Sequence, residues 1–173
     1  MDDEAAAEAA VLAFRATAER LAAEGAPDEA LARFEPARRR FGVMRAARLR
    51  PLGRVWRLGV LLLHPDGAVR ATGATVRSAP PGHARYAALS VEARREVRAA
   101  AFRGPFAPGE TIDYDAPPIE LTPTGIRASG PLLIADGGVK VRWSVSAPED
   151  AARDLAPYLA ERVELLLHPP DGT

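Results

Sequence analysis

The chain has 173 residues and a mass of 18.4 kDa, a size that suits one domain with a substantial core. Apolar residues make up 47% and charged residues 27%, which are globular proportions and exclude wholesale disorder. The formal net charge is zero and cysteine is absent, which excludes disulfides, thiolate metal sites, Fe–S clusters and cysteine nucleophiles.

The N-terminal segment predicts a helix over residues 3–24, because apolar residues recur at the spacings of four and three that place them on one face. Asp2 or Asp3 can cap the first turn, and Gly25 with Pro27 ends the helix. The predicted buried stripe consists of Ala7, Val11, Phe14, Ala18 and Leu21.

The following segment is also expected to be helical, as a short helix from Asp28 to about Glu35 and a second piece from Pro36 towards Leu49. The division falls at Pro36 because proline disrupts a helix interior but is tolerated in a first turn. Residues 1–50 are therefore predicted to be a helical segment that packs on a core formed by 54–168. The second piece carries Arg38, Arg39, Arg40, Arg45, Arg48 and Arg50.

A β-hairpin is predicted over residues 54–63 and 68–77, joined by the turn His64-Pro65-Asp66-Gly67. The first strand becomes apolar on both faces towards its end, which is typical of a central strand covered on both sides.

A helix is predicted next over residues 91–103, with Ser90 as its N-cap. Its expected buried stripe consists of Ala93, Val97, Ala100 and Ala101, and its solvated face of Arg94, Arg95 and Arg98.

The Pro- and Gly-rich stretch 104–131 is expected to permit only short edge strands, at Thr111–Tyr114 and Ile119–Thr122. A second hairpin is predicted over 132–146, around the turn at 136–138. Its strict alternation places Trp143 on the core face, so Trp143 and Trp56 are interpreted as core partners across the sheet or as the lining of a ligand pocket.

The chain is expected to end in a helix that begins at a capping box formed by Ser146 and Glu149. Its predicted apolar stripe is Ala152, Leu155, Leu159, Val163 and Leu166. Pro157 should kink this helix, because proline removes one main-chain hydrogen bond.

Together these elements predict an α+β fold in a single domain over 1–173. It should contain one antiparallel sheet of about five strands flanked by helices, in the order α-α-β-β-α-β-β-β-α.

No catalytic motif is present. Neither a Gly-x-Gly-x-x-Gly or Walker loop nor a Gly-x-Ser-x-Gly elbow occurs, so nucleotide-phosphate binding by such loops and α/β-hydrolase chemistry have no support. The three histidines, His64, His83 and His168, lack ligand spacing. We therefore assign no catalytic residue and expect no metal and no cofactor.

The best candidate ligand site combines the loop residues His83, Arg85 and Tyr86 with the carboxylates Asp113 and Asp115. On a strand, Asp113 and Asp115 would share one face and could meet a cation or share a proton. This site requires a concavity between the sheet and the 104–131 stretch. The alternatives are a solvated loop histidine, and edge-strand acids that are exposed or paired with arginine.

Charge is distributed unevenly, with net charges of −6 over residues 1–35, +12 over 36–103 and −6 over 104–173. The eight arginines between Arg38 and Arg57, with no acid among them, could bind nucleic acid. The interpretation we favour from sequence is a solvated helix face that the acidic flanks neutralise, because the net charge gives no long-range attraction to a polyanion.

The sequence therefore predicts a non-catalytic cytoplasmic module that binds a protein partner or a small ligand, as a homodimer. No membrane association is expected, because the acidic N-terminus lacks signal-peptide character and no apolar run reaches about 18 residues. A small-molecule enzyme or ligand pocket is the alternative. Nucleic-acid binding through the 38–57 arginines is the third hypothesis.

Overall fold

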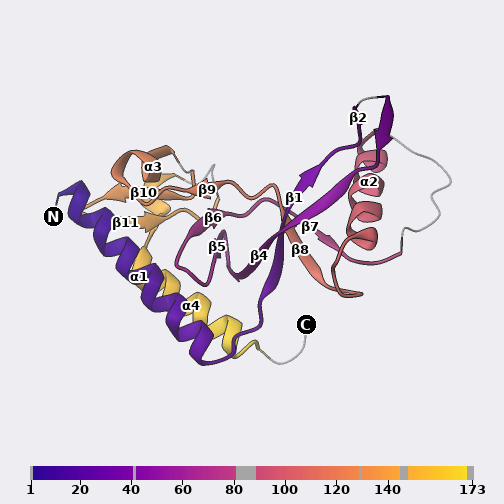
Figure 1. Cartoon of the computed structure of the whole chain (residues 1–173). Coiled ribbons are helices and arrows are strands. Elements are labelled where there is room, and N and C mark those ends of the chain that lie inside the picture. The colour runs from indigo at the N-terminus through magenta and orange to yellow at the C-terminus, as the bar shows by residue number, and fades with distance from the viewer. Residues whose placement is uncertain (1, 41, 81–88, 129, 145–147, 171–173) are drawn as a thin grey trace. The chain divides into compact units, whose positions relative to one another are not determined.

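A computed structural model describes residues 2–40, 42–80, 89–128, 130–144 and 148–170 (Figure 1). The elements in these residues are, in chain order, α1 (Asp3–Ala23), β1 (Glu29–Glu35), β2 (Arg38–Arg40), β3 (Val43–Arg45), β4 (Arg48–Leu58), β5 (Leu61–Leu63), β6 (Val69–Ala71), β7 (Ala74–Arg77), α2 (Leu89–Arg103), β8 (Thr111–Tyr114), β9 (Pro118–Ile119), α3 (Pro123–Ala128), β10 (Leu132–Ala135), β11 (Gly138–Val141), the 3-10 helix η1 (Glu149–Ala151), β12 (Arg153–Asp154) and α4 (Leu155–Leu167).

The predicted α+β class is confirmed, but the predicted element order and the single antiparallel sheet are wrong. The main sheet has the strand order β7-β8-β1-β4-β5-β6-β9, and it is mixed because β1 runs parallel to β8. Two small sheets, β10-β11-β12 and β2-β3, complete the described strands.

The chain divides into two compact units, each made of separate segments. The first unit consists of residues 1–28, 55–72 and 117–173, and the second of residues 29–54 and 73–116. Strand β4 passes from the second unit into the first along its length.

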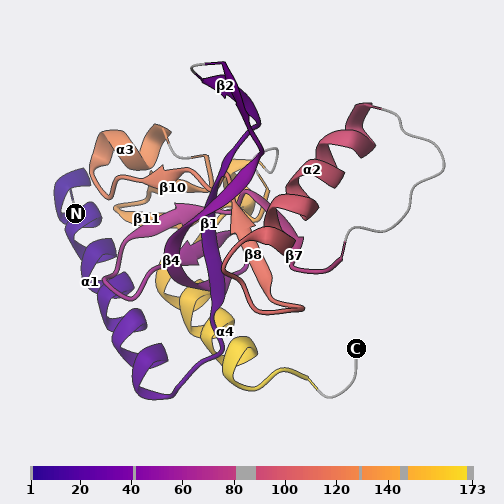
Figure 2. The ribbon, with the colours of Figure 1, turned by 45° about the vertical axis from the view of Figure 1, so that its right-hand side comes forward.

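Helix α1 forms one wall of the first unit's core, as predicted. Asp2 caps it, with Oδ1 accepting a hydrogen bond from the Ala5 amide at 2.8 Å. Phe14 and Leu21 are completely buried, together with small residues of the predicted stripe. Helices α1 and α4 lie side by side in both views, and the core residues of both belong to one apolar cluster (Figures 1 and 2).

The predicted strand 54–63 is in fact a tight hairpin, because the chain turns at Gly59, where φ is +65°. Strand β5 pairs antiparallel with both β4 and β6, so the predicted turn at 64–67 is confirmed. The expected return strand is also interrupted: β6 ends at Ala71, and β7 pairs with β8 instead. Gly73 permits this break, since a Cβ there would lie 2.3 Å from the Tyr114 carbonyl oxygen.

Strands β10 and β11 confirm the second predicted hairpin, but the alternating strand stops at Val141. Beyond the strand, Trp143 is 67% exposed, so its predicted place in the core is wrong. Trp56 is buried, and its indole N–H donates to the Ala26 carbonyl at 3.2 Å.

The terminal helix α4 begins at Leu155, later than expected, after η1 and the short strand β12. Ser146 of the predicted capping box lies outside the described residues. Pro157 occupies the first turn, where an amide has no partner within the helix, so the predicted kink is wrong. Leu155, Leu159 and Val163 face the core as predicted.

The second unit corrects the helical prediction for residues 28–49, which form β1, β2, β3 and the start of β4. Ala30, Leu31 and Ala32 are buried in succession, which requires cover on both faces and suits a strand rather than a helix with one apolar stripe. Pro36 then sets the bend before β2. Gly42, whose φ is +80°, sets the turn of the β2-β3 hairpin.

Helix α2 covers one face of the second unit's strands (Figure 2). Val97, Ala100 and Ala101 are buried there against Ala30 and Ile112, as the helical spacing predicts. Ala93 is exposed, so its predicted burial is wrong. The exposed face is confirmed for Arg94, Arg95 and Arg98.

The Pro- and Gly-rich stretch is more ordered than predicted. Strand β8 lies between β7 and β1 rather than at an edge. The second expected edge strand shrinks to β9, and the short helix α3 follows it.

Candidate functional site

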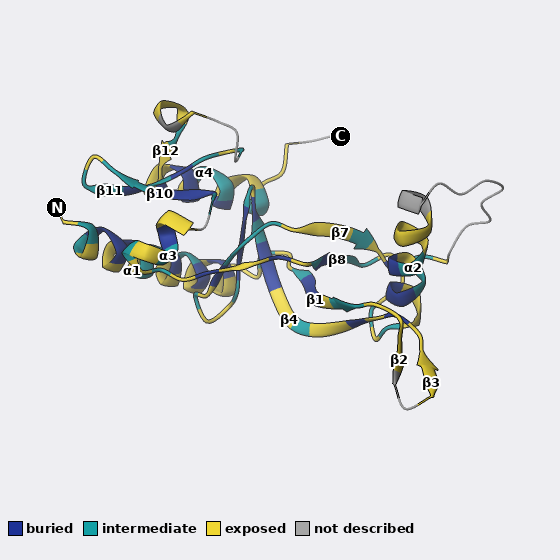
Figure 3. Cartoon of the chain, turned by 90° about the horizontal axis from the view of Figure 1, so that it is seen from above, coloured by how far each residue is buried: buried dark blue, intermediate teal, exposed yellow. Residues whose placement is uncertain are grey.

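The most distinctive surface of the second unit is the hairpin β2-β3 with the start of β4, which we call the arginine arm (residues 38–40, 43–45 and 48). Its strands are held in the register Arg38↔Arg45, Arg39↔Met44 and Arg40↔Val43. Figure 3 shows both strands largely exposed. The sequence interpretation of these arginines as a helix face is therefore wrong.

The register places like charges directly opposite one another. Arg38 and Arg45 face each other across the two strands, where opposed Cβ atoms are about 5 Å apart. Such a pair destabilises a hairpin unless an anion lies between or beside the guanidinium groups. Within the described part of the chain, neither arginine has an ion-pair partner.

One carboxylate approaches the arm. The Glu35 side chain accepts a hydrogen bond from Arg48 Nε at 2.5 Å, and this contact lowers the pKa of the carboxyl group. Arg48 is therefore paired, and Glu35 also attracts Arg38 at longer range, whereas Arg39 and Arg45 have no ion pair among the described residues. The arm thus presents a net positive charge.

A hollow of about 240 Å³ opens where the arm meets β1 and β4. It is lined by Glu35, Pro36, Arg38, Arg45, Ala46 and Arg48. The lining residues include three arginines and one glutamate, which makes this hollow suited to an anion with several oxygen acceptors, such as a phosphate group.

A second hollow, of about 570 Å³, lies on the other side of Arg48 and is lined by residues 48–51 and 103–105. Arg103 Nη2 donates to the Ala47 carbonyl at 3.0 Å, which ties the end of α2 to the chain between β3 and β4. Arg50 adds a further exposed cation there, without an ion pair among the residues described. The positive surface therefore continues from the arm along β4.

Two large apolar side chains accompany the arginines on β3. Val43 is 65% and Met44 67% exposed, although residues of this type are usually covered. An apolar patch beside guanidinium groups is typical of a surface that contacts a partner rather than only water.

Several acids of the flanks pair with cations of the first unit. Arg20 pairs with both Glu24 and Glu164 at 2.7 Å, and Arg153 with Glu161 at 2.6 Å. Two further pairs are Asp3 with Arg127 and Asp136 with Lys140. Acids of the flanks also pair with two arginines of the 38–57 run, Glu35 with Arg48 and Glu110 with Arg54. The expected neutralisation is therefore found in part, and it does not extend as ion pairs to Arg39 and Arg45 within the described residues.

The ligand site predicted from sequence is covered only in part. His83, Arg85 and Tyr86 lie outside the described residues. Asp113 is completely buried in β8, between Leu31 and Thr75 of the neighbouring strands. Asp115 is exposed with φ of +54°, because β8 ends at Tyr114, so the two carboxylates do not share the strand face that their spacing predicts.

The arginine arm could have been recognised from the sequence. Arg38-Arg39-Arg40-Phe41-Gly42-Val43-Met44-Arg45 has a glycine at the centre of two extended tripeptides, which is a hairpin signal. The high helix propensity of arginine and alanine concealed it.

No group of three or more histidine or acidic side chains in the described residues is placed to hold a metal ion. None of the described helices combines the length and apolar character needed to span a bilayer.

Comparison with protein families, with curated proteins and with solved structures finds no match for this chain.

Proposed function

We propose that this protein is a non-catalytic binding module that holds the phosphate backbone of a duplex nucleic acid on its arginine arm. The observation that carries the proposal is the Arg38–Arg45 pair, two like charges opposed across a hairpin beside a hollow whose lining includes three arginines. A phosphate group there would remove the repulsion and accept several charge-assisted hydrogen bonds. Binding of a protein partner or small ligand, the first expectation from sequence, stays a prediction.

The shape of the arm favours a duplex over a single strand. A two-stranded ribbon fits the major groove, whereas single-stranded binding relies on aromatic side chains for stacking. The hairpin sequence holds one aromatic residue, Phe41, which lies outside the described residues, and one aromatic residue gives no row of stacking platforms. The chain also lacks asparagine and glutamine, which read adenine, so recognition should depend on the backbone and little on sequence.

The proposal predicts a salt-dependent affinity. If Arg38, Arg39 and Arg45 each contact one phosphate, the slope of log K against log salt is about −3, because each contact contributes about −0.9. Fluorescence anisotropy with a labelled mixed-sequence duplex measures this slope. Failure of the protein to bind any duplex at low salt would contradict the proposal.

A matched pair of variants locates the contact. Replacing both Arg38 and Arg45 with glutamine should weaken duplex binding and make the salt slope shallower by about 2. Arg94→Gln with Arg95→Gln removes the same charge from the exposed face of α2 in the same unit, and should leave the slope unchanged. Equal effects of the two double variants would show that net charge alone, and not the arm, determines binding.

Competition identifies the ligand class. Inorganic phosphate and polyglutamate should each displace the duplex only at much higher concentration of charged groups. If phosphate binds as tightly as the duplex, the arm is a small-anion site. If polyglutamate does, it is a site for acidic proteins. Either result would overturn the nucleic-acid proposal.

A further inference from the structure

Among the described residues, one acid lines the hollow at the base of the arginine arm. This acid is Glu35, the last residue of β1, and the arginines Arg38, Arg45 and Arg48 share the lining with it. Its Oε2 accepts a hydrogen bond from Arg48 Nε at 2.5 Å. The Glu35 side chain is 23% exposed against 58% for Arg48. The carboxylate is therefore the more enclosed member of the pair, and it stays beside any anion that enters the hollow.

The charge of Glu35 acts on further arginines besides its hydrogen-bonded partner. The hydrogen bond from Arg48 lowers the pKa of the Glu35 carboxyl group most, and the charges of Arg48, Arg50 and Arg38 lower it further. Electrostatic attraction is mutual, so the carboxylate offsets part of the positive potential that these arginines create in the hollow. An anion that enters there meets attraction from the guanidinium groups and repulsion from Glu35.

Such an acid discriminates between anions by their charge. A phosphodiester of a nucleic-acid backbone carries one negative charge, whereas free phosphate at pH 8 carries nearly two. Arginines alone attract the doubly charged ion about twice as strongly at the same distance, and a carboxylate repels it about twice as strongly. The repulsion from Glu35 therefore reduces the advantage that free phosphate would otherwise have over a backbone phosphodiester.

We propose that Glu35 is a specificity-determining residue of the arginine arm, which shifts the preference of the hollow from free phosphate towards the phosphodiesters of a nucleic-acid backbone. The inference rests on the proposed function, because it concerns which phosphate compound the arm selects. In solutions that contain phosphate, the carboxylate keeps the hollow available to the duplex.

Removing the charge of Glu35 tests the inference. Glu35→Gln keeps a side-chain oxygen that can accept the hydrogen bond from Arg48, and it removes the repulsion. The variant should bind a duplex about threefold more tightly and inorganic phosphate about tenfold more tightly, because doubling a free-energy difference squares the ratio of binding constants. Fluorescence anisotropy at pH 8 and constant ionic strength measures both affinities, with a labelled duplex that lacks terminal phosphates and inorganic phosphate as the competitor.

Two control variants separate the charge of Glu35 from other effects. Glu35→Asp keeps the charge and should keep the native ratio of the two affinities. Glu92→Gln removes the same charge from an exposed position of α2 in the same unit, and should also leave the ratio unchanged. Glu96, whose carboxylate accepts a hydrogen bond from the Ala37 amide at 3.4 Å, is present in every variant and contributes equally to each. Far-UV circular dichroism should show all three variants folded, since neither glutamate belongs to an apolar core cluster.

The inference and the proposed function fail separately. Equal changes for duplex and phosphate in Glu35→Gln, no change in either, or no phosphate binding by any variant would overturn the role of Glu35 and leave duplex binding intact. The same holds if Glu35→Asp behaves like Glu35→Gln, or if Glu92→Gln changes the ratio as much. A native protein that binds no duplex at low salt contradicts both proposals.

Discussion

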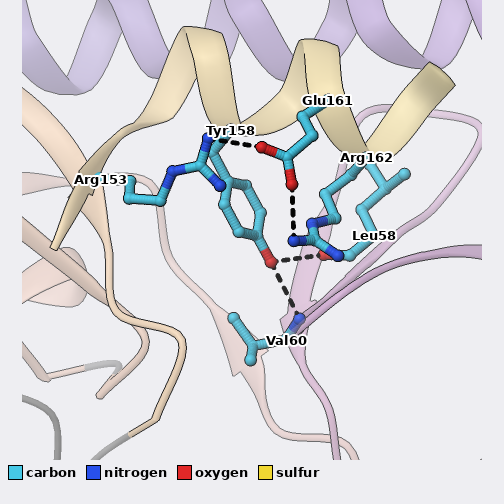
Figure 4. A network of polar contacts seen from close by, with 6 residues as sticks. All are labelled: Leu58, Val60, Arg153, Tyr158, Glu161 and Arg162. Carbon is cyan, nitrogen blue, oxygen red and sulfur yellow. Dashed lines mark hydrogen bonds and ion pairs between the residues drawn. The ribbon is translucent and has the colours of Figure 1, made fainter. Parts of the chain in front are cut away.

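Tyr158 shows how a single hydroxyl group fixes a turn. Its oxygen accepts a hydrogen bond from the Val60 amide at 3.1 Å and donates one to the Leu58 carbonyl at 2.9 Å, so it satisfies both ends of the turn between β4 and β5 (Figure 4). Gly59 lies between them, and a Cβ there would approach the Tyr158 hydroxyl to 2.2 Å. Arg162 lies over the ring, 5.4 Å from its centre, and pairs with Glu161.

Tyr158→Phe should lower the free energy of unfolding by about 1–3 kcal/mol, because it leaves a buried carbonyl and an amide without their shared partner. Urea denaturation measures the change. Tyr114→Phe is the control, since the Tyr114 hydroxyl makes no hydrogen bond within the described residues. An equal loss in both variants would show that the Tyr158 hydrogen bonds do not carry the effect.

Single residues also mark where sequence reasoning fails. Trp143 and Trp56 carry the same chemistry, yet only Trp56 is buried. The alternating pattern that predicted burial for Trp143 continues beyond the last hydrogen-bonded residue, Val141, and a pattern cannot report where pairing ends. Asp113 and Asp115 were linked by the same period of two, which the positive φ of Asp115 interrupts.

The stability effect of replacing Pro157 depends on where helix α4 begins. Near the middle of a helix, its replacement by alanine would stabilise the protein by about 3 kcal/mol, because proline disrupts a helix interior. In the first turn of α4 its ring costs no hydrogen bond and restricts the unfolded chain. Pro157→Ala should therefore destabilise by about 0.4–1 kcal/mol in thermal or urea unfolding. A stabilised variant would contradict the observed start of α4.

Strongly periodic elements could be predicted from the sequence, and elements that depend on distant pairing could not. Helices α1 and α2 and the β10-β11 hairpin follow from local spacing and turn residues alone. Strand β1 consists largely of residues that favour a helix. It becomes a strand because it pairs in parallel with β8, about 80 residues later in the chain. The arginine arm was not predicted for the same reason, because its residues also favour a helix and were assigned to one.

At the scale of the whole molecule, neighbouring cations stabilise the ionised form of several carboxyl groups. Hydrogen bonds from Arg48, Lys140, Arg153 and Arg20 lower the pKa of Glu35, Asp136, Glu161 and Glu164 respectively. Since each pKa is lower in the folded state, the unfolded chain binds more protons as the pH falls. The contribution is complete above the ordinary pKa of these groups and disappears as the pH falls through their folded values.

The free energy of unfolding should therefore decline as the pH is lowered below about 5, in urea titrations at several pH values. Because these groups are exposed, the decline should be modest and smaller at high salt. Glu164→Gln should make the pH dependence shallower, whereas Glu8→Gln, which removes a carboxylate without an ion pair in the described chain, should not. A steeper dependence at high salt would contradict this account.

The interleaving of the two units bears on how the protein is made. The smaller unit is complete once residue 116 has been synthesised, but the larger one needs its third segment, which starts at residue 117 and includes α4. Helix α1 is translated first, but it can pack against α4 only after the third segment has been synthesised. Truncation from the C-terminus should accordingly remove the larger unit's core and leave every segment of the smaller one, whereas no cut from the N-terminus can do the reverse.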